Sequence, residues 1–210
     1  MEALLRSNAA GSAPTEAQPA LSLRELNAGL EKRVPGVGGH SKRVARYAVG
    51  IARELDLPRA QAERVRRAAA IHDIGKLEMP AGLVNKPGPL SPDEFAIVRL
   101  HAVAGARIAV ALGQPELAAI VRHHHERFDG DGYPDGLAGE EIPLGARIVA
   151  VADTFDALSS ARPYRAAMDP ERALGVLADQ VGSQFDPAVV AAFRSYYSGP
   201  RATLLRALGR

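Results

Sequence analysis

Apolar residues recur at spacings of three and four along most of this chain of 210 residues. This is the spacing of one face of an α-helix. The clearest case predicts a helix over about residues 39–57, with an apolar stripe formed by Val44, Tyr47, Ala48, Ile51 and Leu55. No stretch alternates between apolar and polar residues for long enough to form a strand. The sequence therefore predicts an all-α fold with no significant sheet.

Proline and capping residues mark where further helices begin. The run Ser91-Pro92-Asp93-Glu94 is a capping box with proline at the first helical position, and its helix is expected to end near Gly113. Similar start signals occur at Pro58, Pro115, Pro143, Asp169-Pro170 and Asp186-Pro187. We expect one domain of seven to nine helices over residues 21–210, after a flexible tail at residues 1–20 that shows no periodicity.

Composition excludes several classes of protein. The chain has no cysteine, so it is neither a disulfide scaffold nor a thiol-dependent enzyme. Its longest purely apolar run, residues 188–193, is far shorter than the roughly 20 residues that span a bilayer. The net charge of +2 is too small to indicate binding to a nucleic acid polymer. We expect a protein of the cytoplasm that binds no membrane.

All six histidines lie between His40 and His125, and three of them are consecutive. A single histidine on an apolar helix face is usually a core residue, but this set also includes Asp73 and an acid inside the apolar run VAVADTFDAL, Asp153. A buried carboxylate needs a partner. We therefore predict that several helices bring one cluster of ligands together, formed by His40, His72, Asp73, His101, His124, His125 and Asp153.

Imidazole and carboxylate ligands without thiolate are typical of manganese, iron or zinc. If Asp73 bridges, one ion takes His40, His72, Asp73 and Asp153, and the other takes Asp73, His101, His124 and His125. A pair of ions with a bridging hydroxide is the recurring arrangement for the hydrolysis of phosphoesters. His123 is left over, and we expect it near the surface or behind the ligands.

The ordered motifs of the chain resemble those of the HD-GYP subfamily of HD-domain phosphohydrolases. The matching segments are HSKRVARYA (40–48), HDIGK (72–76), NKPGPLSPDEF (85–95), the lone His101, residues 124–165 with the run DGDGYPDG, and FDP (185–187). The resemblance implies a phosphodiesterase that linearises cyclic di-GMP to pGpG and in some members cuts again to GMP. It also implies an iron or manganese pair held by the same seven residues.

The resemblance implies roles for further residues. Lys76 corresponds to a lysine that faces the scissile phosphate, so Asp73 and Lys76 are the expected catalytic residues. Gly132, Tyr133 and Pro134 match the loop that gives the subfamily its name, and Tyr133 is expected to contact a guanine. Arg162 and Arg165 match two positions that contact the phosphates of the ligand.

The chain also departs from the family pattern. Gly36 stands where members with a third metal ion carry a glutamate, so we expect two ions. Three further positions also carry residues that are uncommon in the family, namely Glu78, Ala81 and Ala161. None of them is an expected metal ligand.

Three alternatives stay open: an inactive cyclic di-GMP receptor or interaction module, a phosphohydrolase of another nucleotide, and a di-iron oxygenase. The complete ligand set and Lys76 argue against the inactive module. The loop with Tyr133 and the run RPYR favour a nucleotide substrate over the oxygenase. Beyond the substrate, the expected partner is a regulatory protein or a second copy of the chain.

Overall fold

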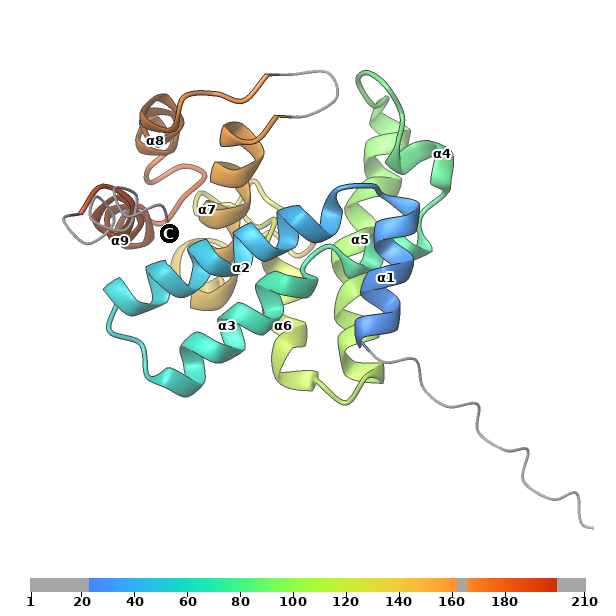
Figure 1. Cartoon of the computed structure of the whole chain (residues 1–210), viewed down its shortest axis with the longest axis horizontal. Helices are drawn as coiled ribbons and strands as arrows, with labels where there is room; N and C mark the ends of the chain where they lie inside the picture. Colours follow the sequence, from blue (N-terminus) through green and yellow to red (C-terminus); the bar gives the residue numbers. More distant parts are fainter. Residues whose placement is uncertain (1–22, 162–165, 200–210) are drawn as a thin grey trace, which may run out of the picture.

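The computed structural model describes residues 23–161 and 166–199, in which the regular elements are helices joined by loops (Figure 1). The tail expected at residues 1–20 lies outside these ranges. The α-helices of the described residues are α1 (Leu23–Arg33), α2 (Val37–Glu54), α3 (Arg59–Ile71), α4 (Ala81–Val84), α5 (Pro92–Ala111), α6 (Pro115–His123), α7 (Leu144–Ser159), α8 (Pro170–Asp179) and α9 (Pro187–Ser198). Two short 3-10 helices, η1 (Ile74–Glu78) and η2 (Gly139–Glu141), complete the list. The predicted all-α fold is confirmed.

The helix starts follow the capping residues in the sequence. The Ser91 hydroxyl accepts from the backbone N–H of Glu94, and the Glu94 carboxylate accepts from the backbone N–H of Ser91. Asp169 and Asp186 cap α8 and α9 with their carboxylates alone, each of which accepts from two backbone N–H groups of the first turn, and each is followed by proline. Directly after His72 and Asp73 the chain tightens into the 3-10 helix η1, an element for which no helix start was predicted.

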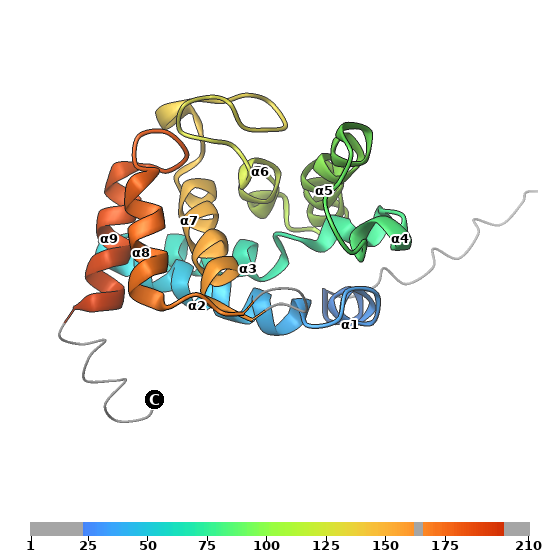
Figure 2. The same cartoon turned by 90° about the horizontal axis from the view of Figure 1, so that it is seen from above.

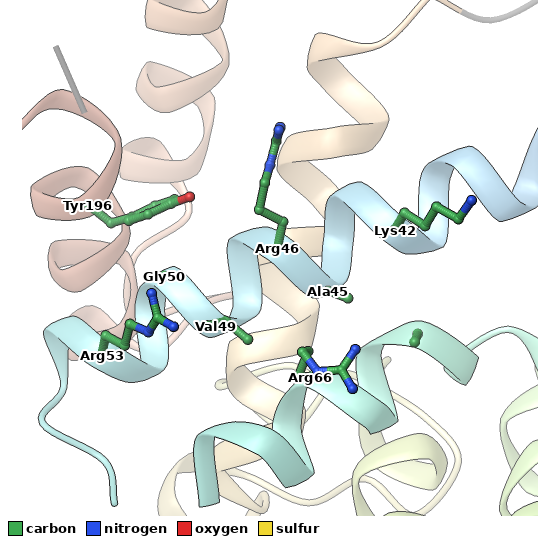
Figure 3. A pocket seen from close by; sticks show the side chains of 9 residues that line it. Lys42, Ala45, Arg46, Val49, Gly50, Arg53, Arg66 and Tyr196 are labelled. Atoms are coloured by element: carbon green, nitrogen blue, oxygen red, sulfur yellow. The ribbon is translucent and has the colours of Figure 1, made fainter. Parts of the chain in front are cut away.

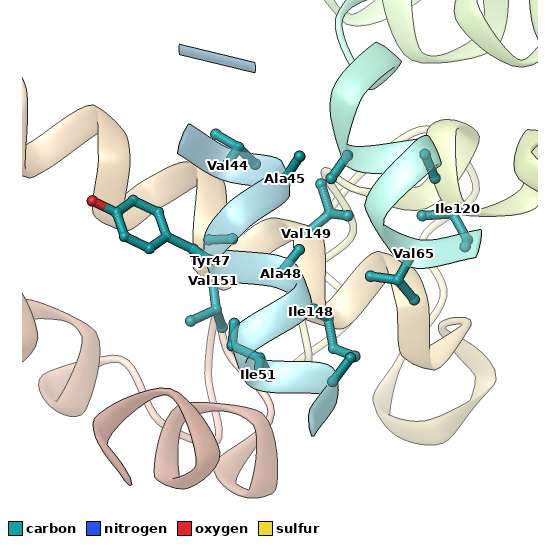
Figure 4. Close-up of a cluster of buried hydrophobic side chains, with 14 of the residues drawn as sticks. Val44, Ala45, Tyr47, Ala48, Ile51, Val65, Ile120, Ile148, Val149 and Val151 are labelled. Atoms are coloured by element: carbon teal, nitrogen blue, oxygen red, sulfur yellow. The ribbon is translucent and has the colours of Figure 1, made fainter. Parts of the chain in front are cut away.

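Helix α2 is the centre of the core and packs against α3, α7 and α9 (Figures 1 and 2). Its predicted stripe is buried, with Val44, Ala48 and Ile51 completely inaccessible to solvent. Figure 4 draws these side chains together with Val65 of α3 and Ile148 of α7, which belong to the same buried cluster. None of the described helices is both long and apolar enough to cross a membrane.

The 3-10 helix η1 lies directly on α5. A Cβ atom added at Gly75 would lie 1.9 Å from the carbonyl oxygen of His101 and 2.5 Å from the backbone nitrogen of Gly105. Only glycine permits so close an approach of two backbones. This contact brings the residues on either side of Gly75, among them Asp73 and Lys76, against the middle of α5.

Replacing Gly75 should therefore be costly. We expect Gly75→Ala to lower the free energy of unfolding by about 1–3 kcal/mol, because the added methyl group pushes η1 away from α5. The matched control is Gly175→Ala inside α8, where a Cβ would meet no atom within 4 Å. This change should raise stability by about 0.5–1 kcal/mol. Urea unfolding followed by circular dichroism measures both; equal effects of the two substitutions would contradict the close-contact explanation.

Candidate metal centre

Five segments that are distant in the sequence bring the predicted ligands to one place. Helix α2 carries His40 near its first turn, and α3 ends directly before His72 and Asp73. His101 lies in the middle of α5 and Asp153 in the middle of α7. His124 and His125 follow the last residue of α6. The candidate ligands come from the ends of some helices and the middles of others. The apolar residues next to each ligand can therefore remain in the core.

The side chains form two groups that share Asp73. Ligand atoms of Asp73, His101, His124 and His125 all lie within 4.8 Å of one another, as do those of His40, His72 and Asp73. Asp153 joins the second group, since its Oδ1 lies 3.1 Å from Nε2 of His40 and 3.9 Å from Nε2 of His72. The structure thus brings all seven predicted residues together, and Asp73 occupies the shared position.

Three imidazoles are held in one orientation by their own helices. Nδ1 of His72 lies 2.8 Å from the carbonyl oxygen of Ala69, and Nδ1 of His101 and His124 each lie 2.7 Å from a carbonyl oxygen one turn earlier. A carbonyl oxygen only accepts, so Nδ1 must carry the proton. Nε2, with its lone pair, then faces the cluster, which is the usual arrangement of a histidine that binds metal.

Two of these Nε2 atoms, in His72 and His124, are buried and have no hydrogen-bond partner within the described part of the chain. A buried polar atom without a partner is costly and rare in folded proteins. A metal ion would accept both lone pairs, and the nearby carboxylates of Asp73 and Asp153 would balance its charge. The donor set therefore fits a divalent cation.

Burial sets the protonation of one side of the cluster. It lowers the pKa of His101, moves the pKa of His124 well below its ordinary value, and lowers the pKa of His125 to about 3. Burial alone would raise the pKa of Asp73, but the charge of Lys76 and the electrostatic interactions with the surrounding imidazoles outweigh it and lower that pKa strongly. At neutral pH this side presents neutral imidazoles and an ionised carboxylate.

His40 behaves differently because carboxylates flank both of its nitrogens. Burial lowers its pKa, but the hydrogen bonds with Asp153 and Asp156 prevail and raise it to about 9. Asp156 Oδ2 lies 2.7 Å from Nδ1 of His40, opposite the nitrogen that faces the cluster. Arg43 in turn donates to both oxygens of Asp156, at 2.6 and 3.0 Å.

Sequence reasoning missed Asp156 and Arg43. Asp156, 1% exposed, follows Asp153 by three residues on α7, and Arg43 follows His40 by three residues on α2. A second acid one turn after the first in an apolar helix was a signal that could have identified Asp156. A carboxylate behind a ligating histidine orients the ring and raises its basicity.

Lys76, the predicted catalytic lysine, lies in η1 at the edge of the cluster. Its ammonium group donates to Oδ2 of Asp73 at 2.6 Å, and the side chain is half-buried. It therefore supplies a positive charge beside the carboxylate that the two groups share.

The loop that contains Gly132, Tyr133 and Pro134 covers one side of the cluster. The Tyr133 ring stacks on the His125 ring, with centroids 4.9 Å apart and planes 30° apart. A Cβ at Gly132 would lie 2.3 Å from the backbone nitrogen of Arg127, so this position requires glycine. Pro134 follows and is half-buried. The two arginines predicted to contact phosphates, Arg162 and Arg165, lie outside the described residues.

His123 lies apart from the cluster and holds this loop. Its Nε2 is 2.8 Å from Oδ2 of Asp135, and Arg122 donates to both oxygens of the same carboxylate at 2.7 and 2.6 Å. Glu126, which is buried, accepts from the backbone N–H of Asp135 at 2.7 Å. These contacts fasten the loop to the end of α6, next to Tyr133.

A separate pocket of about 420 Å³ lies where α2, α3 and α9 meet (Figure 3). Lys42, Arg46, Arg53, Arg66 and the Tyr196 ring are among its lining residues. None of the candidate metal ligands lines this pocket, so it is distinct from the histidine and aspartate cluster.

Comparison with known proteins places this geometry in a family. The family model described as "HD domain" matches residues 26–189. The chain is 42% identical over 166 residues to a 3'3'-cGAMP-specific phosphodiesterase 3 of Vibrio cholerae, covering 79% of this chain and 36% of that protein. It is 41% identical over 172 residues to the cyclic di-GMP phosphodiesterase response regulator RpfG of Xanthomonas campestris, covering 80% of this chain and 46% of that protein.

Among solved structures, an HDG"Y"P protein of Bdellovibrio bacteriovorus has the same fold, with a TM-score of 0.64 at 20% identity, over 84% of this chain and 57% of that one. The chain spans between about a third and a half of the length of the curated relatives it matches. The matched family model and two relatives above 40% identity agree with the motifs read from the sequence. The chain therefore belongs to the HD domain family, as its resemblance to HD-GYP proteins predicted.

Proposed function

We propose that this chain is a metal-dependent phosphodiesterase that hydrolyses cyclic di-GMP to pGpG, and to GMP where a second cut follows. The observation that supports the proposal is the cluster of histidines and aspartates around Asp73, with two buried Nε2 atoms that have no partner in the described chain. Relatives named as phosphodiesterases of cyclic dinucleotides support it independently.

The proposed cofactor is a pair of iron or manganese ions. Asp73, His101, His124 and His125 would hold one ion, and His40, His72, Asp73 and Asp153 the other. Bound there, the pair would supply Lewis acidity that activates a water molecule for attack and neutralises charge on the phosphate.

The protein's own residues would orient and polarise the substrate. Lys76 places its ammonium group beside Asp73, where it can stabilise negative charge that develops on the phosphate or on the leaving oxygen. Asp156 fixes the His40 ring through Nδ1, so Nε2 keeps its direction. Gly132, Tyr133 and Pro134 would contact a base, and Arg162 and Arg165 would contact phosphates.

A second candidate substrate is 3'3'-cGAMP, because a relative 42% identical to this chain is named for it. Cyclic di-GMP and 3'3'-cGAMP share the ring of two phosphates, so the same cluster would serve either one. A cytoplasmic location and a regulatory protein or second copy as partner belong to the same proposal.

We expect two ions per chain and not three. Gly36 offers no side chain for a third ion, and the nearest upstream acid, Glu31, accepts from the backbone N–H groups of Gly36 and Gly38 at 2.8 and 2.6 Å. Metal quantification on protein purified without oxygen tests this expectation. A stoichiometry near three would contradict it.

The central test compares Asp73→Ala with His123→Ala. Removal of the shared carboxylate should lower metal loading and the hydrolysis of cyclic di-GMP by at least about 100-fold, since even residues behind metal ligands are worth 10–100-fold. His123→Ala should keep most of both, because its Nε2 pairs with Asp135 outside the cluster. Metal analysis and separation of products measure the two effects. Equal losses in both variants would overturn the assignment of ligands, and wild-type protein that is loaded but inactive would overturn the proposed function.

The two metal positions should differ in proton release. His40, with a pKa raised to about 9, is protonated at pH 7 and must lose the proton from Nε2 before it binds an ion. His101, His124 and His125 have lowered pKa values and are already neutral. Binding at the His40 position should release about one proton at pH 7, and affinity there should rise with pH up to about 9. Calorimetry in two buffers of different ionisation enthalpy measures the release; identical heats in both buffers would contradict it.

A further inference from the structure

Arg99 is the outermost member of a stack that begins at the candidate ligand His125. The Tyr133 ring lies on the His125 ring at 4.9 Å, and the guanidinium carbon of Arg99 lies 4.7 Å from the Tyr133 centroid. Phe95, one turn earlier on α5, meets the Tyr133 ring edge-on at 6.0 Å and lies 5.9 Å from the same guanidinium. An aromatic and cationic wall therefore runs from the cluster to the surface.

The guanidinium of Arg99 is available for a ligand. Its side chain is exposed, and within residues 23–161 and 166–199 it makes neither a hydrogen bond nor an ion pair. Other arginines near the site are engaged, for example Arg122 with Asp135 and Arg127 with Asp129. Stacking on a ring uses the flat face of a guanidinium and leaves its N–H edge free to donate.

We propose that Arg99 recognises a guanine base of the cyclic dinucleotide through hydrogen bonds to O6 and N7. This inference rests on the proposed function and names the base that the site selects. Guanine presents two acceptors on this edge, which match the fork of an arginine, whereas adenine presents N7 beside an N–H donor that faces the guanidinium unfavourably. Phe95, 45% exposed, supplies apolar surface next to the guanidinium for the flat base.

The position of Arg99 favours a base over a phosphate. Lys76 and the candidate ligands lie together around Asp73, where the scissile phosphate would bind. The Tyr133 ring separates Arg99 from that cluster on the side of His125. Within a nucleotide the base is likewise separated from the phosphate, by the width of the sugar.

The experiment measures selectivity for guanine over adenine. Wild-type protein, Arg99→Ala and Arg99→Lys are compared with cyclic di-GMP and cyclic di-AMP as probes. Equilibrium binding is measured on protein treated with EDTA, and kcat/KM on protein loaded with manganese. The matched control is Arg46→Ala, because Arg46 is an exposed arginine that lies 5.1 Å from the ring of Tyr47, beside the separate pocket.

We expect wild-type protein to prefer cyclic di-GMP and Arg99→Ala to reduce this preference by about 5- to 150-fold, the range for one bidentate contact with guanine. Arg99→Lys should lose most of the preference too, since an ammonium keeps the charge but not the planar fork. Arg46→Ala should keep the ratio of the wild type.

A selectivity ratio in Arg99→Ala equal to that of the wild type would overturn the inference. If both nucleotides also bind more weakly by the same factor, Arg99 attracts their charge without distinguishing the base. If wild-type protein binds the nucleotides but hydrolyses neither, the proposed function fails while the binding ratio still decides the role of Arg99. If it binds neither, both proposals fail.

Discussion

The buried carboxylate of Asp73 is the group on which the rest of the candidate site depends. It is ionised although it is almost inaccessible to solvent, because Lys76 donates to it and imidazoles surround it. An isolated buried charge would cost several kcal/mol, so this carboxylate needs all of its neighbours at once. The same charge lies within reach of both groups of ligands, which makes them one centre instead of two.

The fold serves this carboxylate by bringing backbones unusually close. Gly75 rests on α5 at His101 and Gly105, so the turn after Asp73 lies against the helix that supplies an imidazole. Helix α2, packed between α3, α7 and α9, positions His40 relative to both His72 and Asp153. The core and the site are thus built from the same helices: α2 carries both His40 and its buried apolar stripe, and α7 carries both Asp153 and the buried Ile148.

The two halves of the centre differ in electrostatics although their ligands are similar. Neutral histidines dominate the half near His101, where burial outweighs the nearby carboxylate. In the other half, His40 lies between Asp153 and Asp156 and keeps its proton at neutral pH. The aromatic stack of His125, Tyr133 and Arg99 adds a wall that leads from the first half towards solvent.

The sequence by itself determined the helices and the set of candidate ligands. Capping residues and apolar periodicity act over a few residues, so Ser91, Asp169 and Asp186 predicted their helix starts correctly. The histidines and Asp73 stood out because their types are unusual on apolar helices. Only the tertiary structure decided which partner each residue meets: Asp156 behind His40, Asp135 beside His123, and Arg99 over Tyr133. These pairs join segments up to 116 residues apart, and their contacts depend on how helices pack, which no local pattern records.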